Sequence, residues 1–239
     1  MLFIRKVFIY IALFWTSCFL AQDASILSQP QLTVSHQVTD LYGANFGLNT
    51  RLEYNADNDK LFSSQFIQLS HFSSFHFRNT EKISVGLLYR FKEKSSNQVA
   101  NEFRITQQYH FTFKPRSYRF SHRIRTEERF IGNELLFRIR YRLGIDFPLN
   151  GEELNINEFY SFFNAESLLV LQHSFTPRYD TRLSGGVGNQ ISDRLKLQFL
   201  VQHRWERITY KADSKFFLLL GGYLKIYRID QKTLHRDKF

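Results

Sequence analysis

The sequence predicts an all-β protein, namely a single antiparallel up-and-down transmembrane β-barrel of ten to twelve strands after an N-terminal signal peptide. The chain of 239 residues contains 26 Phe, 12 Tyr and 2 Trp, yet its mean hydropathy is −0.33. This aromatic content excludes a disordered chain. Apolar and polar residues alternate over ten or more positions at a time, which indicates strands. After the first twenty residues no stretch is apolar enough to span a bilayer as a helix.

The first 21 residues have the pattern of a secretory signal peptide. Arg5 and Lys6 precede the apolar run 7–15, and the small residue Ala21 precedes polar sequence. The run is too short for a transmembrane anchor. We therefore expect cleavage after Ala21, a mature barrel over 22–239 and a fall in formal charge from +10 to +8.

Cys18 is the single cysteine, and it lies in the segment predicted to be removed. The mature chain would then contain no disulfide and no thiol site. The alternative is a lipoprotein cut just before Cys18, with the thiol acylated.

The clearest alternation covers residues 134–147, where arginines occupy every second position between apolar residues. Seven apolar positions on one face would extend about 40 Å, longer than a typical globular strand. The same pattern predicts strands over 43–55, 82–93, 102–113, 118–130 and 195–205, and more weakly over 31–39, 62–77, 158–171, 178–190 and 215–227.

These segments number about eleven, whereas single-chain bacterial barrels have an even number of strands. We therefore expect twelve strands, with residues 24–29 forming a short first strand, or ten, with one weak segment outside the wall. Connections at 39–43, 79–82, 114–117 and 191–194 are tight, and those at 94–101 and 172–178 are longer. Short turns at one end and longer loops at the other are typical of outer-membrane barrels. The segment 149–155 is the exception on the short-turn end.

A secreted β-sandwich with an aromatic core is the soluble alternative. Sandwich strands are usually shorter than these, whereas a tilted membrane strand needs about 9–11 residues. Aromatic residues also fall near strand ends, where membrane barrels carry interfacial girdles. These residues are Tyr54, Phe91, Phe113, Tyr118, Phe147 and Trp205. The sequence therefore favours an outer-membrane location in contact with outer-membrane lipid.

The polar faces of the strands would point into a narrow lumen. We predict a lumen polar network of Arg104, Arg123, Arg125, Arg138, Arg140, Arg142, Glu127, Asn164, Glu166, Arg182, Arg204 and Glu206. One interpretation is a charge-paired plug with a structural role. The other is a constricted pore or pocket that favours a small anionic solute, because crowded guanidinium groups attract carboxylate and phosphate. The sequence does not decide between an open and a plugged lumen, and it leaves the oligomeric state undetermined.

The alternative functional class is an outer-membrane lipid-modifying enzyme of the lipase or deacylase type. Ser70, Ser73, Ser121 and Ser174 lie near histidines in the sequence, but proximity in sequence does not place a nucleophile beside a base. Only His110 falls clearly on a polar face. We therefore expect no catalytic residue and no enzyme activity. No spacing suggests a metal site or a cofactor, and arginines spread over interior faces argue against nucleic-acid binding.

Four segments resemble the exported barrel proteins grouped as domain of unknown function 2490. They are LFRIRYRLGIDFPL at 136–149, NEFYSFFNAES at 157–167, RYDTRLSGGVG at 178–188 and DRLKLQFLVQHRW at 193–205. The resemblance implies an outer-membrane barrel of a Gram-negative bacterium over nearly all of the mature chain, and it transfers no catalytic residue. It also directs attention to Asn164, Glu166, Arg182 and Gly186 as central positions.

Overall fold

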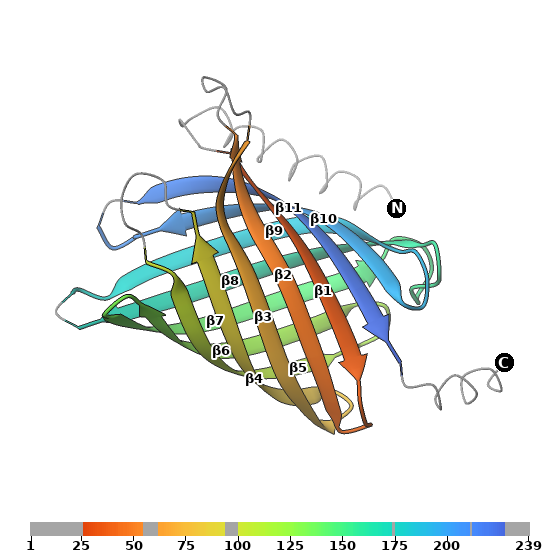
Figure 1. The fold of residues 1–239 in the computed structure, drawn as a ribbon. Coiled ribbons are helices and arrows are strands. Elements are labelled where there is room, and N and C mark those ends of the chain that lie inside the picture. The colour runs from red at the N-terminus through yellow and green to blue at the C-terminus, as the bar shows by residue number, and fades with distance from the viewer. Residues whose placement is uncertain (1–25, 55–61, 94–99, 174, 211, 228–239) are drawn as a thin grey trace.

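The computed structural model describes residues 26–54, 62–93, 100–173, 175–210 and 212–227, which form eleven β-strands closed into one barrel (Figure 1). The predicted signal peptide and Cys18 lie outside the described residues. The strands are β1 (Ile26–Gln37), β2 (Tyr42–Tyr54), β3 (Phe62–Arg78), β4 (Glu81–Lys92), β5 (Glu102–Phe113), β6 (Arg119–Ile131), β7 (Glu134–Pro148), β8 (Phe159–Gln172), β9 (Arg178–Gln190), β10 (Leu195–Glu206) and β11 (Asp213–Ile226).

Each strand pairs antiparallel with its neighbour in the sequence, and the barrel closes where β1 meets β11 in parallel (Figure 1). The expectation of an even strand number, and of an entirely antiparallel wall, was therefore wrong. An odd number of alternating strands brings the first and last strands into the same direction, so the closing pair must be parallel. The stretch 24–29 adds no separate strand, because Ile26–Gln37 is continuous.

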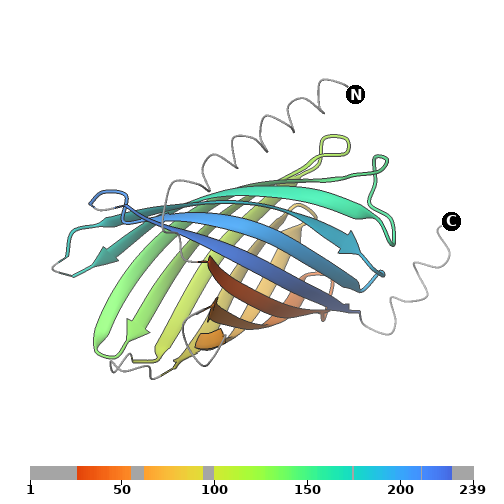
Figure 2. The ribbon, with the colours of Figure 1, turned by 90° about the horizontal axis from the view of Figure 1, so that it is seen from above.

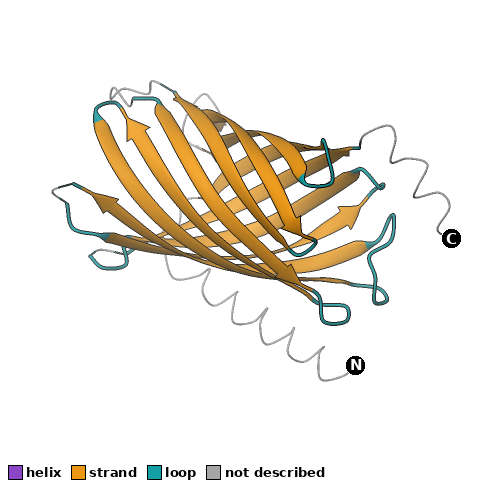
Figure 3. Cartoon of the chain, turned by 90° about the horizontal axis from the view of Figure 1, so that it is seen from below, coloured by secondary structure: helices purple, strands orange, loops and turns teal. Residues whose placement is uncertain are grey.

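The connections separate into two groups at opposite ends of the barrel, where Figure 3 draws the described turns in teal. One end, here called the turn end, carries 38–41, 79–80, 114–118, 149–158 and 191–194. The other end, here called the loop end, is where β2, β4, β6, β8 and β10 finish and the strands that follow them begin. The segment 149–155 does lie at the turn end within the longest connection there, and 132–133 is a tight turn among longer loops.

The two faces of the wall differ in chemistry as the alternation predicts. Leu48, Ile67, Leu87 and Phe199 point outward and are 46%, 50%, 48% and 49% exposed. The alternate positions face the interior and are mostly polar or charged. Over the ranges that the structure describes, the chain contains no helix with the length and apolar character that a membrane crossing needs.

The two halves of the barrel interior differ in the size of the side chains that fill them. Arginines, glutamates and the apolar residues Leu27, Leu168 and Phe217 fill the half nearer the loop end. In the half nearer the turn end, many inward positions carry small residues, among them Gly144, Gly186 and Gly188. The strands cross the barrel obliquely (Figure 2), so a row of paired residues climbs from one end toward the other.

Gly186 marks a position where the wall requires glycine. A Cβ placed there would lie 2.2 Å from the carbonyl oxygen of Phe199 and 2.6 Å from Leu200 Cβ on the adjacent strand β10. Backbone cannot move aside as a side-chain end can, so a side chain at this position would separate β9 from β10 locally.

We predict that Gly186→Ala destabilises the folded barrel by about 1–3 kcal/mol, the usual cost of overpacking. Gly222→Ala is the matched control, because the nearest atom to its new Cβ is the flexible end of Leu32, at 3.2 Å. The temperature at which each variant loses its compact electrophoretic mobility measures the difference. Equal temperatures for the two variants would contradict the prediction.

Candidate functional site

Three buried glutamates are each surrounded by arginines inside the barrel. Glu102 and Glu127 have no exposed surface, and Glu166 is 5% exposed. Nine arginines form ion pairs with these three carboxylates, namely Arg90, Arg104, Arg123, Arg125, Arg129, Arg138, Arg140, Arg142 and Arg182. We call this set the arginine–glutamate network.

The network is continuous because two arginines each bridge two carboxylates. Arg104 donates to Glu102 through Nε at 3.0 Å, and its Nη1 lies 3.5 Å from Glu127 Oε2. Arg140 donates to Glu127 through Nη1 at 2.7 Å and to Glu166 through Nη2 at 2.9 Å. Arg129 binds both oxygens of Glu102, at 2.6 and 2.9 Å. Strands β4 to β9 are thereby tied together through their inward side chains.

The arginines and glutamates of the network can be buried because they form ion pairs with one another. Removing a charged group from water is costly unless an opposite charge and hydrogen bonds replace the water. Nine positive charges face three negative ones, so each carboxylate serves several guanidinium groups at once. The side-chain atom Glu127 Oε2 illustrates the crowding, because it lies near Arg104 and Arg138 at 3.5 Å without a well-aligned hydrogen bond.

One row of directly paired inward residues crosses the wall from β4 to β11, and we call it the basic row. Its members in order are Lys82, His110, Arg123, Arg142, Glu166, Arg182, Arg204 and Lys215. Like charges directly opposite each other on neighbouring strands are destabilising. Glu166 is the single acidic member, and it relieves the middle of the row but not its ends. The row begins near the turn end at Lys82 and finishes near the loop end at Lys215.

A polar cavity of about 190 Å³ lies where the basic row approaches the turn end. Its lining comes from five adjacent strands, β4 to β8, and consists of Lys82, Gln108, His110, Ser121, Arg123, Arg142 and Asn164. None of these residues is acidic. Gly144 lies between Ser121 and Asn164 in the register, and a Cβ there would come within 2.6 Å of both side chains. The glycine therefore leaves room for the two polar groups.

The structure brings ten of the twelve residues of the predicted lumen network close together, and nine of these, all except Asn164, share ion pairs. Asn164 adjoins them in the lining of the cavity. Arg204 and Glu206 lie on β10, where Arg204 is directly paired with Arg182, but neither residue forms an ion pair with a member of the network. Arg204 donates to Gln202 and to Gln29 and stacks on the Phe217 ring at 3.5 Å, whereas Glu206 lies 3.5 Å from Lys215 Nζ.

Two residues that sequence reasoning missed are important to this arrangement. Arg129 continues the alternation of β6 by one more step beyond Glu127, and it holds Glu102 with two hydrogen bonds. Lys82 has the same parity as Ser84 and Arg90 but stands at the start of its strand. Both residues lie near an end of their strand and have the inward parity, so the alternating pattern could have predicted that they face the interior.

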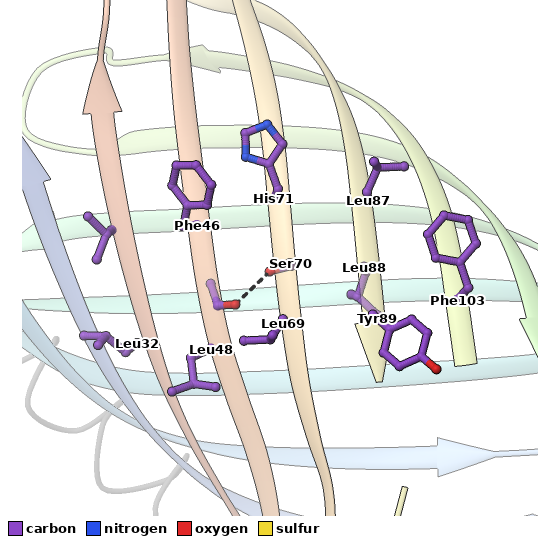
Figure 4. A pocket seen from close by; sticks show the side chains of 12 residues that line it. Leu32, Phe46, Leu48, Leu69, Ser70, His71, Leu87, Leu88, Tyr89 and Phe103 are labelled. Carbon is purple, nitrogen blue, oxygen red and sulfur yellow. Dashed lines mark hydrogen bonds between the residues drawn. The ribbon is translucent and has the colours of Figure 1, made fainter. Parts of the chain in front are cut away.

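A shallow apolar depression of about 440 Å³ lies on the outer face over β1 to β5, with Phe46, Leu48 and Leu69 among its lining residues (Figure 4). At its edge His71 Nε2 lies 3.1 Å from Ser73 Oγ, and Tyr42 hydroxyl lies 3.1 Å from the same Oγ. His71 Nδ1 is buried without a hydrogen-bond partner. A serine and a histidine therefore meet on this face, but no carboxylate among the described residues accepts a hydrogen bond from the imidazole.

Among the described residues, no three histidine, cysteine, aspartate or glutamate side chains gather closely enough to hold a metal ion.

Comparison with known protein families gives a match over residues 29–216 to the protein family of unknown function DUF2490. The chain belongs to the DUF2490 family. The matched region begins in β1 and ends four residues into β11, so the residues of the arginine–glutamate network and of the polar cavity lie within it.

The resemblance seen in the four sequence segments is thereby confirmed, and the DUF2490 match names no activity. No curated protein and no solved structure matches the chain.

We predict that Glu166→Gln destabilises the barrel by about 3–5 kcal/mol, the cost of leaving buried charges uncompensated. Glutamine keeps the shape of the side chain but removes the charge that four arginines share. Glu152→Gln, in an exposed connection, is the control. Urea unfolding in detergent or lipid measures both variants, and an unchanged midpoint for Glu166→Gln would show that the network contributes little.

Proposed function

We propose that this protein is an outer-membrane β-barrel that binds a small anionic solute at its turn end and conducts no current, because the arginine–glutamate network closes its lumen. The single observation that carries the proposal is the continuous chain of buried ion pairs from Glu102 to Glu166 inside a closed barrel.

Support for the outer membrane comes from the outer face. Apolar and aromatic side chains are half exposed there over all sides of the wall, a surface that water disfavours and lipid tails accept. The alternation of apolar outward and polar inward residues agrees with this placement. The signal peptide expected over 1–21 would supply the export that such a location needs.

Support for a closed lumen comes from burial. Arg104, Arg138 and Arg140 are 5%, 7% and 8% exposed, although each lies on the inner wall of a barrel. Water in a continuous channel would reach such side chains. The neighbouring Leu168 and Phe217 are likewise buried, which favours a packed interior over an aqueous passage.

Support for anion binding comes from the ends of the basic row. Directly opposed cations cost stability, and a bound anion would offset that cost where no carboxylate is present. The cavity at the turn end has this character, because its lining includes Lys82, Arg123 and Arg142 and no acid.

A lipid-modifying enzyme is the second candidate, favoured by the hydrogen-bonded pair of His71 and Ser73 beside the apolar depression. A serine hydrolase also needs a group that orients the histidine and donors for the oxyanion. The unpartnered Nδ1 of His71 argues against a complete triad. Hydrolysis of a labelled phospholipid by the purified protein, lost in Ser73→Ala, would favour this alternative.

We predict that the purified protein gives no steady current in a planar bilayer. Arg140→Ser, which removes the side chain shared by Glu127 and Glu166, is expected to produce an anion-selective current, because it opens the closed section and leaves an excess of positive charge. Arg78→Ser, at a highly exposed site, is the control. An open anion-selective current from the unaltered protein would contradict closure.

A further inference from the structure

The cavity at the turn end has an unusual local charge. Glu166 is the carboxylate next to it, and its Oε1 accepts a hydrogen bond from Arg123 Nη2 at 3.3 Å and lies 3.5 Å from Arg142 Nε. The same carboxylate also pairs with Arg140 and Arg182. One negative charge is therefore divided among four guanidinium groups, and little of it remains for the cavity.

Further cations surround the same space. Lys225, Arg123 and Arg119 lie near enough to Lys82 to act on its charge, and Lys82, Arg123, Arg119 and Arg142 act on His110. Asp146 also lies on this side, and it already pairs with Arg119 Nε at 3.0 Å. Because unpaired charges are costly to bury, the described residues leave this cavity prepared for an anion from outside the chain.

The donors around the cavity also differ in kind and direction. Arg123 and Arg142 offer planar forks, Lys82 offers a point charge with three donors, and the amide of Asn164 and the hydroxyl of Ser121 offer neutral hydrogen bonds. They come from different strands of a curved wall, so they converge from several sides. A planar carboxylate has two oxygens in one plane, whereas a tetrahedral oxyanion presents oxygens in all of these directions.

We propose that this cavity binds a phosphoryl group, carried by inorganic phosphate or by a small phosphate monoester. The proposal rests on the proposed binding role of the barrel and specifies its ligand class. Arginine forks match phosphate oxygens in pairs, and a dianion satisfies more of the surplus charge than a monocarboxylate does. The volume of about 190 Å³ corresponds to about six water molecules of liquid volume, which leaves room for the group and part of what carries it.

Isothermal titration of the detergent-solubilised protein with inorganic phosphate tests the proposal, with glycerol 3-phosphate and acetate titrated separately at equal ionic strength. We expect one phosphate per barrel, a comparable or tighter affinity for the monoester, and at least about tenfold weaker binding of acetate. Lys82→Ala should weaken phosphate binding by about tenfold or more, because it removes a charge-assisted hydrogen bond. Lys82→Arg should retain most of the affinity.

Lys114→Ala is the matched control, since Lys114 is exposed in the 114–118 turn. A compact electrophoretic mobility shows whether each variant is folded, and Gln108→Ala provides a second cavity variant if Lys82→Ala fails to fold. Equal binding of acetate and phosphate, or phosphate binding unchanged by both cavity variants, would overturn the phosphoryl proposal. Acetate binding that cavity variants abolish would leave an anion-binding barrel with a different ligand class, and the bilayer recording tests closure independently.

Discussion

A guanidinium group inside a barrel needs a counter-charge, and the number of counter-charges limits how many arginines the interior can hold. In this protein Glu102, Glu127 and Glu166 meet that need for nine arginines. The shared pairs through Arg104 and Arg140 make the three carboxylates one unit. The packing of the loop-end half and the closed lumen depend on these shared ion pairs, and the positive surplus at the turn end follows from the shortage of acid.

The tilt of the strands in the closed wall explains why the excess positive charge lies at the turn end. Strand tilt makes a row of paired residues climb the barrel, so the basic row runs from Lys82 near one end to Lys215 near the other. The carboxylates lie along the loop-end half and the middle, where the large side chains pack. Small residues such as Ser121 and Gly144 occupy the turn-end half. The cavity forms there beside Arg123 and Arg142, which share Glu166 with two further arginines.

Much of the fold could be predicted from alternation alone. The strand expected over 134–147 is Glu134–Pro148, and the one expected over 178–190 has those bounds. The weak first segment, expected from residue 31, begins at Ile26, because Pro30 and the polar residues around it obscure the period. The expectation of an even strand number was wrong because β1 and β11 pair in parallel. Alternation within one strand does not indicate the direction of the strand that closes the barrel.

The sequence predicts which residues line the interior, but it does not predict which of them lie beside one another. Period two indicates which side chains face inward, yet register across strands decides that Arg142, Glu166 and Arg182 are neighbours. The tilt of the strands and the closure of the barrel then decide which end of the basic row lines a cavity. The cavity at Lys82 therefore required the three-dimensional arrangement, although each of its lining residues has the inward parity that the sequence displays.

Closure of the lumen is tested by finding the side of the membrane from which a water-soluble thiol reagent reaches a single cysteine in the cavity. Gln108→Cys would be reconstituted in lipid vesicles, with Lys114→Cys marking the turn end and Asn133→Cys marking the loop end. If the arginine–glutamate network closes the lumen, Gln108→Cys reacts only from the side that labels Lys114→Cys. Reaction from both sides would show a continuous aqueous passage and would contradict the account.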